Sequence, residues 1–235
     1  MTTAVVVAAA GRGLRLGPGP AKALRDLWGE PLLVHAVRSL VAAPSIDMLL
    51  VAAPADQVAL VRRLLADVLP ERVALVVLAG GASRTASVRL ALQVLPDKVD
   101  VVLVHDAARP LVPAAVVEAV VAAVRGGAGA VVPGLPVADT IKHVDDAGAV
   151  TATVDRSMLR SAQTPQGFRR AVLMAAHDAA AAAGEAGEAT DDAALVERIG
   201  GRVVVVPGSP EAFKVTSPLD LLLAEAVLTA RRAAQ

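Results

Sequence analysis

Short apolar segments recur along the chain, and longer segments with helical character separate most of them. The short segments contain no polar residue, which is typical of parallel strands covered by helices on both faces. They predict strands at residues 4–7, 48–52, 74–78, 101–104, 130–132 and 203–206. The longer segments predict helices at residues 32–43, 56–69, 83–95, 113–124, 171–183 and 218–231. This alternation predicts an α/β domain with a mostly parallel sheet.

Residues 139–154 break this alternation. Two segments rich in β-branched residues flank the turn sequence Asp145-Asp-Ala-Gly148, which predicts a hairpin inserted into the α/β pattern. Two strands alone are only marginally stable in water, so we expect this β-arm, at about residues 137–156, to pack against a partner subunit. The chain as a whole, residues 1–235, is predicted to form a single domain.

Composition narrows the possible functions. A chain of 235 residues with 55% hydrophobic content can bury one substantial core. Lys plus Arg and Asp plus Glu number 23 each and aromatic residues make up 1%, which argues against binding of nucleic acid or of a membrane surface. The absence of cysteine excludes disulfides, thiolate zinc sites and thiol nucleophiles. With no basic signal region at the start and no long apolar run, we expect a cytoplasmic protein.

A glycine-rich turn follows the first predicted strand and contains Gly11 and Gly13. Such a turn exposes backbone N–H groups that can wrap a phosphate chain, and Arg15 and Lys22 add positive charge. The dinucleotide-binding fingerprint would need a glycine where Leu16 stands, and no Gly-Lys-Ser/Thr sequence is present to match a Walker motif. The turn therefore predicts phosphate binding of another kind.

Further polar segments follow later strands. Read locally, Ser83 is a helix cap and Arg84 a surface charge. Asp106 stands at the end of the fourth strand, where open α/β sheets bind ligands, and one carboxylate there can hold Mg²⁺ beside substrate phosphates. His105 is interpreted as a structural histidine, whereas Arg109 could clamp a phosphate. From their neighbouring residues alone, Thr190-Asp-Asp is predicted to be a helix N-terminus, and Arg156 and Lys214 are predicted to be surface charges.

Taken together and in order, these segments resemble the 2-C-methyl-D-erythritol 4-phosphate cytidylyltransferases of the non-mevalonate isoprenoid pathway. Each matching segment is weakly specific by itself, but the series covers nearly the whole chain. The matching segments are Ala9-Ala-Gly-x-Gly-x-Arg15, Lys22, Gly80-Gly81-x-x-Arg84-x-x-Ser87-Val88, His105-Asp-Ala-Ala-Arg-Pro110, Asp139-Thr-Ile-Lys142, Gln163-Thr-Pro-Gln166, Thr190-Asp-Asp-Ala193 and Lys214-Val-Thr216.

The resemblance implies a three-layer nucleotidyltransferase (Rossmann-like) fold, CTP and 2-C-methyl-D-erythritol 4-phosphate as substrates, Mg²⁺ as cofactor, and a homodimer formed through the arm. The catalytic cations would be Arg15, Lys22, Arg156 and Lys214. CTP would be held by Ala9, Ala10, Gly11, Gly13, Gly80, Gly81, Arg84 and Ser87. The acceptor would be surrounded by Arg109, Thr140, Thr164 and Thr190, and Asp106 would be the magnesium ligand.

The implied reaction is in-line attack of an acceptor phosphate oxygen on the α-phosphorus of CTP, with release of pyrophosphate. A phosphate monoester is already an anion at neutral pH, so the reaction needs cations more than a general base. Three alternatives stay open: a ribitol-5-phosphate cytidylyltransferase, an NAD-dependent oxidoreductase and a catalytically silent nucleotide-binding module. An acceptor panel, an NAD-binding assay and pyrophosphate release distinguish them.

Overall fold

The computed structural model describes the chain except for residues 12, 14–15, 185–188 and 234–235. All six predicted strands are confirmed, with slightly longer bounds: β1 (Thr2–Ala8), β4 (Met48–Ala53), β5 (Ala74–Ala79), β6 (Val99–Asp106), β7 (Ala130–Pro136) and β12 (Val203–Pro207). They run parallel in one eight-stranded sheet of order β10-β7-β11-β6-β1-β4-β5, in which β12 pairs with the other side of β7. The sheet is therefore mostly parallel, as predicted.

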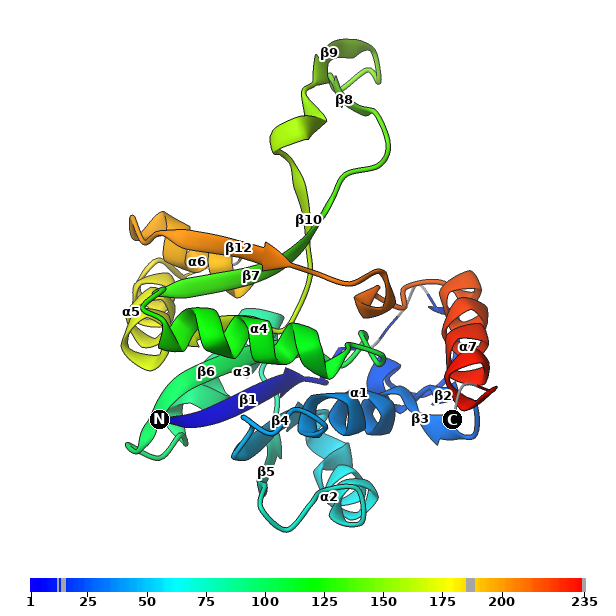
Figure 1. Ribbon diagram of the computed structural model, residues 1–235, viewed down its shortest axis with the longest axis vertical. Coiled ribbons are helices and arrows are strands. Elements are labelled where there is room, and N and C mark those ends of the chain that lie inside the picture. Colours follow the sequence, from blue (N-terminus) through cyan, green and yellow to red (C-terminus); the bar gives the residue numbers. More distant parts are fainter. Residues whose placement is uncertain (12, 14–15, 185–188, 234–235) are drawn as a thin grey trace.

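Two strands of this sheet run in the opposite direction and were not predicted. They are β10 (Arg160–Ala162), which pairs with β7, and β11 (Gln166–Arg169), which lies between β6 and β7. Both belong to the segment that returns from the arm (Figure 1). The return path of the arm is therefore built into the centre of the sheet.

Helices cover both faces of the sheet, which confirms the three-layer architecture. The helices are α1 (Leu32–Val41), α2 (Val58–Ala66), α3 (Arg84–Gln93), α4 (Ala114–Arg125), α5 (Arg170–Ala182), α6 (Asp192–Arg198) and α7 (Pro218–Ala233). The predicted helix at 56–69 is divided, because residues Ala55–Gln57 form a 3₁₀ turn ahead of α2. The short α6 was foreseen only as a helix N-terminus.

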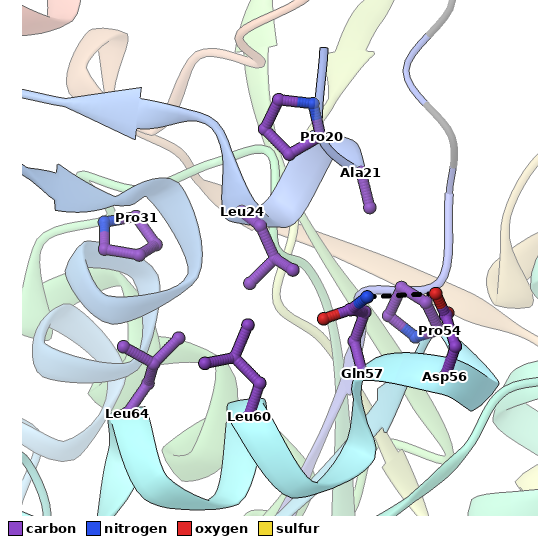
Figure 2. A pocket seen from close by; sticks show the side chains of 9 residues that line it. All are labelled: Pro20, Ala21, Leu24, Pro31, Pro54, Asp56, Gln57, Leu60 and Leu64. Carbon is purple, nitrogen blue, oxygen red and sulfur yellow. Dashed lines mark hydrogen bonds between the residues drawn. The ribbon is translucent and has the colours of Figure 1, made fainter.

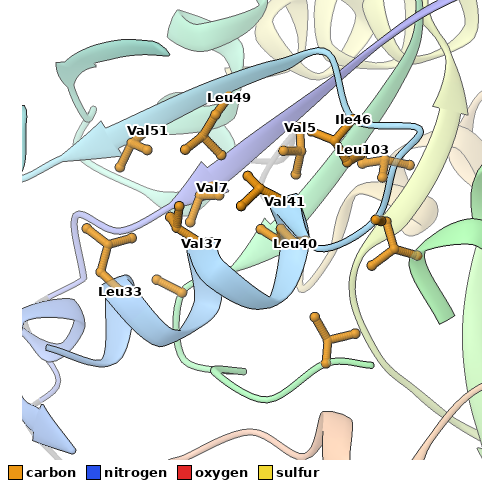
Figure 3. Packing of buried hydrophobic residues seen from close by; sticks show 14 of the residues in the cluster. Val5, Val7, Leu33, Val37, Leu40, Val41, Ile46, Leu49, Val51 and Leu103 are labelled. Carbon is orange, nitrogen blue, oxygen red and sulfur yellow. The ribbon is translucent and has the colours of Figure 1, made fainter. Parts of the chain in front are cut away.

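Alternation along the strands explains the two main cores. Val5 and Val7 of β1 face α1, α2 and α4, whereas Ala4 and Val6 point to the opposite face and pack with α3, α5 and α6. Figure 3 shows Val7 beside Val37 and Val5 near Val41, both on α1. A smaller cluster joins α7 to β2 (Asp26–Leu27), which pairs with β3 (Glu30–Pro31). Aliphatic packing on both faces of the sheet thus holds the strands in place, and with them the loops that follow their carboxyl ends.

The predicted hairpin is confirmed as β8 (Ile141–Val144) paired with β9 (Val150–Val154). Asp145 closes its turn by donating its N–H to Ala149, and Gly148 has a φ of +81°, a backbone conformation that favours glycine. The arm projects from the body and exposes apolar side chains, including Val150 and Met158 (Figure 1). That the arm contacts a second subunit stays a prediction.

Among the described residues, no helix is both long enough and apolar enough to cross a membrane.

Candidate active site

Several of the segments singled out from the sequence meet at the edge of the sheet formed by the carboxyl ends of β1, β4, β5 and β6. Ala8, the last residue of β1, pairs with Ala52 of β4 on one side and with Asp106 of β6 on the other. The N–H of Ala9 donates to the Ala52 carbonyl, and the N–H of Gly80 donates to the Ala53 carbonyl. Because parallel strands end at the same edge, the glycine turn, the Gly80–Gly81 segment and Asp106 lie at neighbouring positions there.

The glycine turn closes back on Lys22. The N–H of Lys22 donates to the carbonyl of Gly11 over 3.1 Å, at the start of a 3₁₀ turn (Lys22–Leu24). Gly13 has a φ of +70°, and a Cβ there would lie 2.6 Å from the Cβ of Lys22. Gly13 thus lets the backbone pass close to Lys22. Arg15 lies outside the described residues.

The second glycine segment, Gly80–Gly81, packs against the first at Ala10. A Cβ on Gly80 would lie 2.5 Å from the Cβ of Ala10, so only glycine allows the two segments to touch. The Ser87 hydroxyl accepts the Gly81 N–H over 3.0 Å and donates to the Ser83 carbonyl over 2.7 Å. Ser83 caps α3 by accepting the Ala86 N–H, so its interpretation as a helix cap is confirmed.

Asp106 is held between two cations. Its Oδ1 accepts from Nε of Arg84 over 3.0 Å, and its Oδ2 accepts from Nζ of Lys214 over 2.7 Å. The interpretation of Arg84 as a surface charge was therefore wrong, because its guanidinium is mostly buried and paired. Lys214 is also paired, although its side chain keeps 39% of its surface exposed.

Electrostatics keep this carboxylate ionised. Burial raises the pKa of Asp106, but the charges of Arg84 and Lys214 and their hydrogen bonds outweigh it and hold the pKa far below its ordinary value. Asp106 is thus ionised at neutral pH. It cannot itself attract a phosphate, so binding of a phosphate here depends on the neighbouring cations.

Thr164 and His105 help to hold Asp106 in position. The Thr164 hydroxyl accepts the Asp106 N–H and bonds to Nδ1 of His105, each over 3.1 Å. Nε2 of His105 bonds to the Arg109 carbonyl over 3.0 Å, so its interpretation as a structural histidine is confirmed. The Arg109 guanidinium donates to the carbonyls of Ala162 and Ala212. Arg109 and Thr164 therefore lie near Asp106, and their roles toward an acceptor stay predictions.

Comparison with known proteins identifies the family of the chain. The sequence model of the family described as 2-C-methyl-D-erythritol 4-phosphate cytidylyltransferase (IspD) matches residues 3–230. The chain belongs to this family.

Relatives and solved structures agree with this membership. The cytidylyltransferase of this name from Streptomyces avermitilis is 56% identical, with 98% of this chain and 93% of the relative covered. The one from Saccharopolyspora erythraea is also 56% identical and is covered in full by 97% of this chain. The crystal structure of the cytidylyltransferase from Thermus thermophilus matches with a TM-score of 0.75 at 38% identity, over 97% of this chain and 98% of that one.

One subunit does not bring together every residue that the family resemblance assigns to the site. Thr140 precedes β8, and Arg156 begins a 3₁₀ turn after β9 and donates to the Ala138 carbonyl, so both belong to the arm, away from Asp106 (Figure 1). Thr190 is exposed just before Asp191, which caps α6, so the helix N-terminus read from the sequence is confirmed. The acceptor roles of these three residues stay predictions.

The sequence interpretation missed the use of Asp192. This second acidic residue of the Thr190 motif is 1% exposed and accepts from Nη1 of Arg84 over 2.6 Å. Asp191 caps the helix, and an acidic residue directly after the cap is ordinary because it complements the helix dipole, so the local sequence carried no signal of this second use. Only the fold shows that its partner is Arg84.

The residues at this edge suit a magnesium ion that arrives with a nucleotide. Among the described residues, no three His, Cys, Asp or Glu side chains gather into a group that could hold a metal by itself. Mg²⁺ is usually bound by one or two carboxylates together with substrate phosphates, and Asp106 offers one such carboxylate. Each oxygen of Asp106 accepts a hydrogen bond from a cationic side chain and keeps a further lone pair, so an ion can approach Oδ2 beside Lys214 or in its place.

A separate hollow of about 540 Å³ lies between residues 20–24 and α2 (Figure 2). Most of its lining is apolar, including Leu24, Leu60 and Leu64, and the charged residue in the described lining is Asp56. Among its described lining residues the hollow has one carboxylate and no cationic side chain to bind a triphosphate. In this cytidylyltransferase we therefore expect CTP at the Asp106 edge.

Burial of His105 gives the fold a pH dependence. Burial lowers the pKa of His105 to about 4, although its bond to the Arg109 carbonyl acts in the opposite direction. Between pH 6.5 and 4 the unfolded chain therefore binds a proton that the folded chain does not, and stability falls as the pH is lowered. We expect a loss of about 2 kcal/mol from this residue between pH 7 and pH 5.

Urea unfolding of the wild type and of His105→Gln at both pH values measures this effect. The variant will be less stable at pH 7 but should lose less stability on acidification. An equal loss in both proteins would show that another group causes the pH dependence.

Proposed function

We propose that this chain carries out the reaction of its family at the Asp106 edge: it transfers the cytidylyl group of CTP to 2-C-methyl-D-erythritol 4-phosphate, giving 4-diphosphocytidyl-2-C-methyl-D-erythritol and pyrophosphate. Family membership supports the reaction. The geometric support is the meeting of the glycine turn, Asp106 and Lys214, which lie far apart in the sequence, at one sheet edge.

The nucleotide half of the site consists of backbone and cations. The turn through Gly11 and Gly13 supplies backbone N–H groups for the triphosphate, and Lys22 supplies a charge beside it. Arg15 supplies a second charge. Gly80, Gly81 and Ser87 lie next to Ala10, where they can contact the nucleoside, and the Ser87 hydroxyl keeps one lone pair for the base.

The reaction depends on cations that neutralise the charge of the two phosphorylated substrates. The attacking oxygen of the acceptor phosphate is already anionic, whereas negative charge builds up at the α-phosphorus and on the departing pyrophosphate. Lys22 and Arg15 stabilise that charge, and Lys214 and Arg109 orient the acceptor phosphate. Lys214 can turn from Asp106 toward a phosphate because its side chain is flexible and partly exposed.

Magnesium would be held by Asp106 and the phosphates of CTP. When bound, it supplies further positive charge to those phosphates. Asp106→Asn should raise the Mg²⁺ concentration at which pyrophosphate release is half-maximal. Titration of Mn²⁺ binding by electron paramagnetic resonance, with and without CTP, provides a second measurement. Unchanged requirements for both ions in the variant would exclude Asp106 as a ligand.

We infer that the site is completed in a homodimer. Thr140 and Arg156 stand on the arm, and the arm exposes apolar side chains that a second subunit can cover. The arm would carry these two residues to the Asp106 edge of the neighbour, where Arg156 would meet the acceptor phosphate. Because CTP is a cytoplasmic nucleotide, we place the reaction in the cytoplasm.

An acceptor panel tests the function. Pyrophosphate release is measured with CTP and each of several polyol phosphates, including 2-C-methyl-D-erythritol 4-phosphate and ribitol 5-phosphate, and with UTP in place of CTP. We expect the highest kcat/KM for CTP with the methylerythritol phosphate. A preference for ribitol 5-phosphate, or CTP binding without pyrophosphate release from any acceptor, would overturn the proposal.

A further inference from the structure

A row of alternating charges runs from the reacting edge into the interior. Lys214 contacts Asp106, Asp106 contacts Arg84, and Nη1 of Arg84 donates to Oδ2 of Asp192 over 2.6 Å. At the inner end, Nε2 of His177 lies 2.9 Å from Oδ1 of Asp192. Apart from His177, the row consists of two cations and two carboxylates, whose charges balance.

The members of this row come from different elements. Arg84 is the first residue of α3, Asp106 the last of β6 and Asp192 the first of α6, while His177 lies in α5. Asp192 and His177 are each only 1% exposed, and Arg84 is 22% exposed. A carboxylate so deeply buried depends on these partners for its charge, which fixes its position relative to the core.

The two contacts of Arg84 orient its planar guanidinium. Nε faces Asp106 and Nη1 faces Asp192, so the side chain is held between two anions that are themselves anchored on β6 and α6. Nη2 is buried and has no partner among the described residues. The charge of Arg84 is thus matched by protein carboxylates, and its role in holding CTP stays a prediction.

We propose that Asp192, supported by His177, is a positioning residue for cytidylyl transfer: it fixes Arg84, which fixes the Asp106 carboxylate at the reacting edge. This inference rests on the proposed function. When Lys214 turns to a phosphate, Arg84 remains as the contact that keeps Asp106 in place. The fixed contact is the buried one, and the movable contact is the partly exposed one.

A double-mutant cycle tests this relay. Asp192→Asn keeps the size of the side chain but removes the charge that holds Arg84, and we expect kcat to fall about 10–100-fold, as for other supporting groups behind a ligand. The KM for CTP should change much less. In an Asp106→Asn background the same substitution should have little further effect on kcat, because the residue through which it acts is already altered. Additive effects would overturn the proposal.

Matched variants separate positioning from stability. Val196→Ala removes packing on α6 without touching Arg84, and it should lower stability to urea while leaving kcat unchanged. His177→Gln keeps an N–H donor near Asp192 and should retain more activity than His177→Leu. This pair tests the relay even if Asp192→Asn does not fold. Equal activity in the two His177 variants, or a kcat for Val196→Ala as low as that of Asp192→Asn, would contradict it.

A crystal structure of Asp192→Asn supplies a readout that is independent of turnover. We expect the Asp106 carboxylate to shift or to adopt a second conformer. An unmoved Asp106 in a variant with reduced kcat would overturn the relay while leaving the proposed function intact. In contrast, a wild type that accepts no polyol phosphate overturns the proposed function, whatever the position of Asp106 in the variant.

Discussion

Lys22→Ala is expected to lower kcat about 10²–10³-fold, the usual cost of removing one fixed charge-stabilising donor, or about 2.7–4 kcal/mol of transition-state stabilisation. The residue begins the turn that closes the glycine loop, so its position is set by the bond to Gly11 and by the close approach of Gly13. Its charge is needed most as pyrophosphate departs, so kcat should fall more than CTP affinity. Steady-state pyrophosphate release at saturating CTP measures the effect.

Two variants control for this result. Lys22→Arg retains a positive charge and should keep part of the activity. Lys98→Ala removes an exposed lysine ahead of β6, at the opposite edge of the sheet, and should leave kcat unchanged. If kcat is unaltered in Lys22→Ala, this lysine has no part in the mechanism.

Mixing two inactive variants should restore activity if the arm completes the site of the neighbouring subunit. Lys22→Ala removes a cation from the body, which is the sheet with its covering helices, and Arg156→Ala removes one from the arm. A mixed dimer then contains one site with both lesions and one with none, so equal amounts with free exchange should give about a quarter of wild-type activity. The measurement is pyrophosphate release after the variants are mixed under conditions that allow subunits to exchange.

The matched control is a mixture of Lys22→Ala with Lys214→Ala. Both of these lesions lie on the body, so each site of the mixed dimer keeps one lesion and no activity should return. Recovery in the first mixture alone supports arm exchange. If both mixtures stay inactive although native mass spectrometry detects mixed dimers, each site is built from one subunit.

Much of the fold could be predicted because its parallel strands are buried on both faces. Such strands consist of unbroken apolar residues, and all six were found with small errors at their ends. Strands β10 and β11 were missed because they are short and contain Arg160, Ser161 and Gln166, so no apolar pattern marks them. They form because the chain returning from the arm finds free backbone groups beside β6 and β7.

The candidate site was harder to derive from local sequence. Arg84 looked like a surface charge because its partners, Asp106 and Asp192, stand 22 and 108 positions away along the chain. Lys214 is likewise 108 positions from Asp106. Local patterns report caps and strand ends, which is why Ser83 and His105 were interpreted correctly. Ion pairs between distant elements exist only once the sheet has formed. The family resemblance assigned Arg84, Asp106 and Lys214 to one site but did not predict that they pair with one another.

The base of the arm has a consequence for how the choice of acceptor can change. The chain leaves the body at Pro136 and returns at Arg160, and these two residues face each other as paired neighbours of β7 and β10. Everything between them can therefore be exchanged as a cassette, with the hydrogen-bonded sheet and the glycine turns untouched. In the proposed dimer, Thr140 and Arg156 travel with that cassette. A different polyol phosphate could thus be recruited by grafting a new arm onto an unaltered nucleotide-handling body.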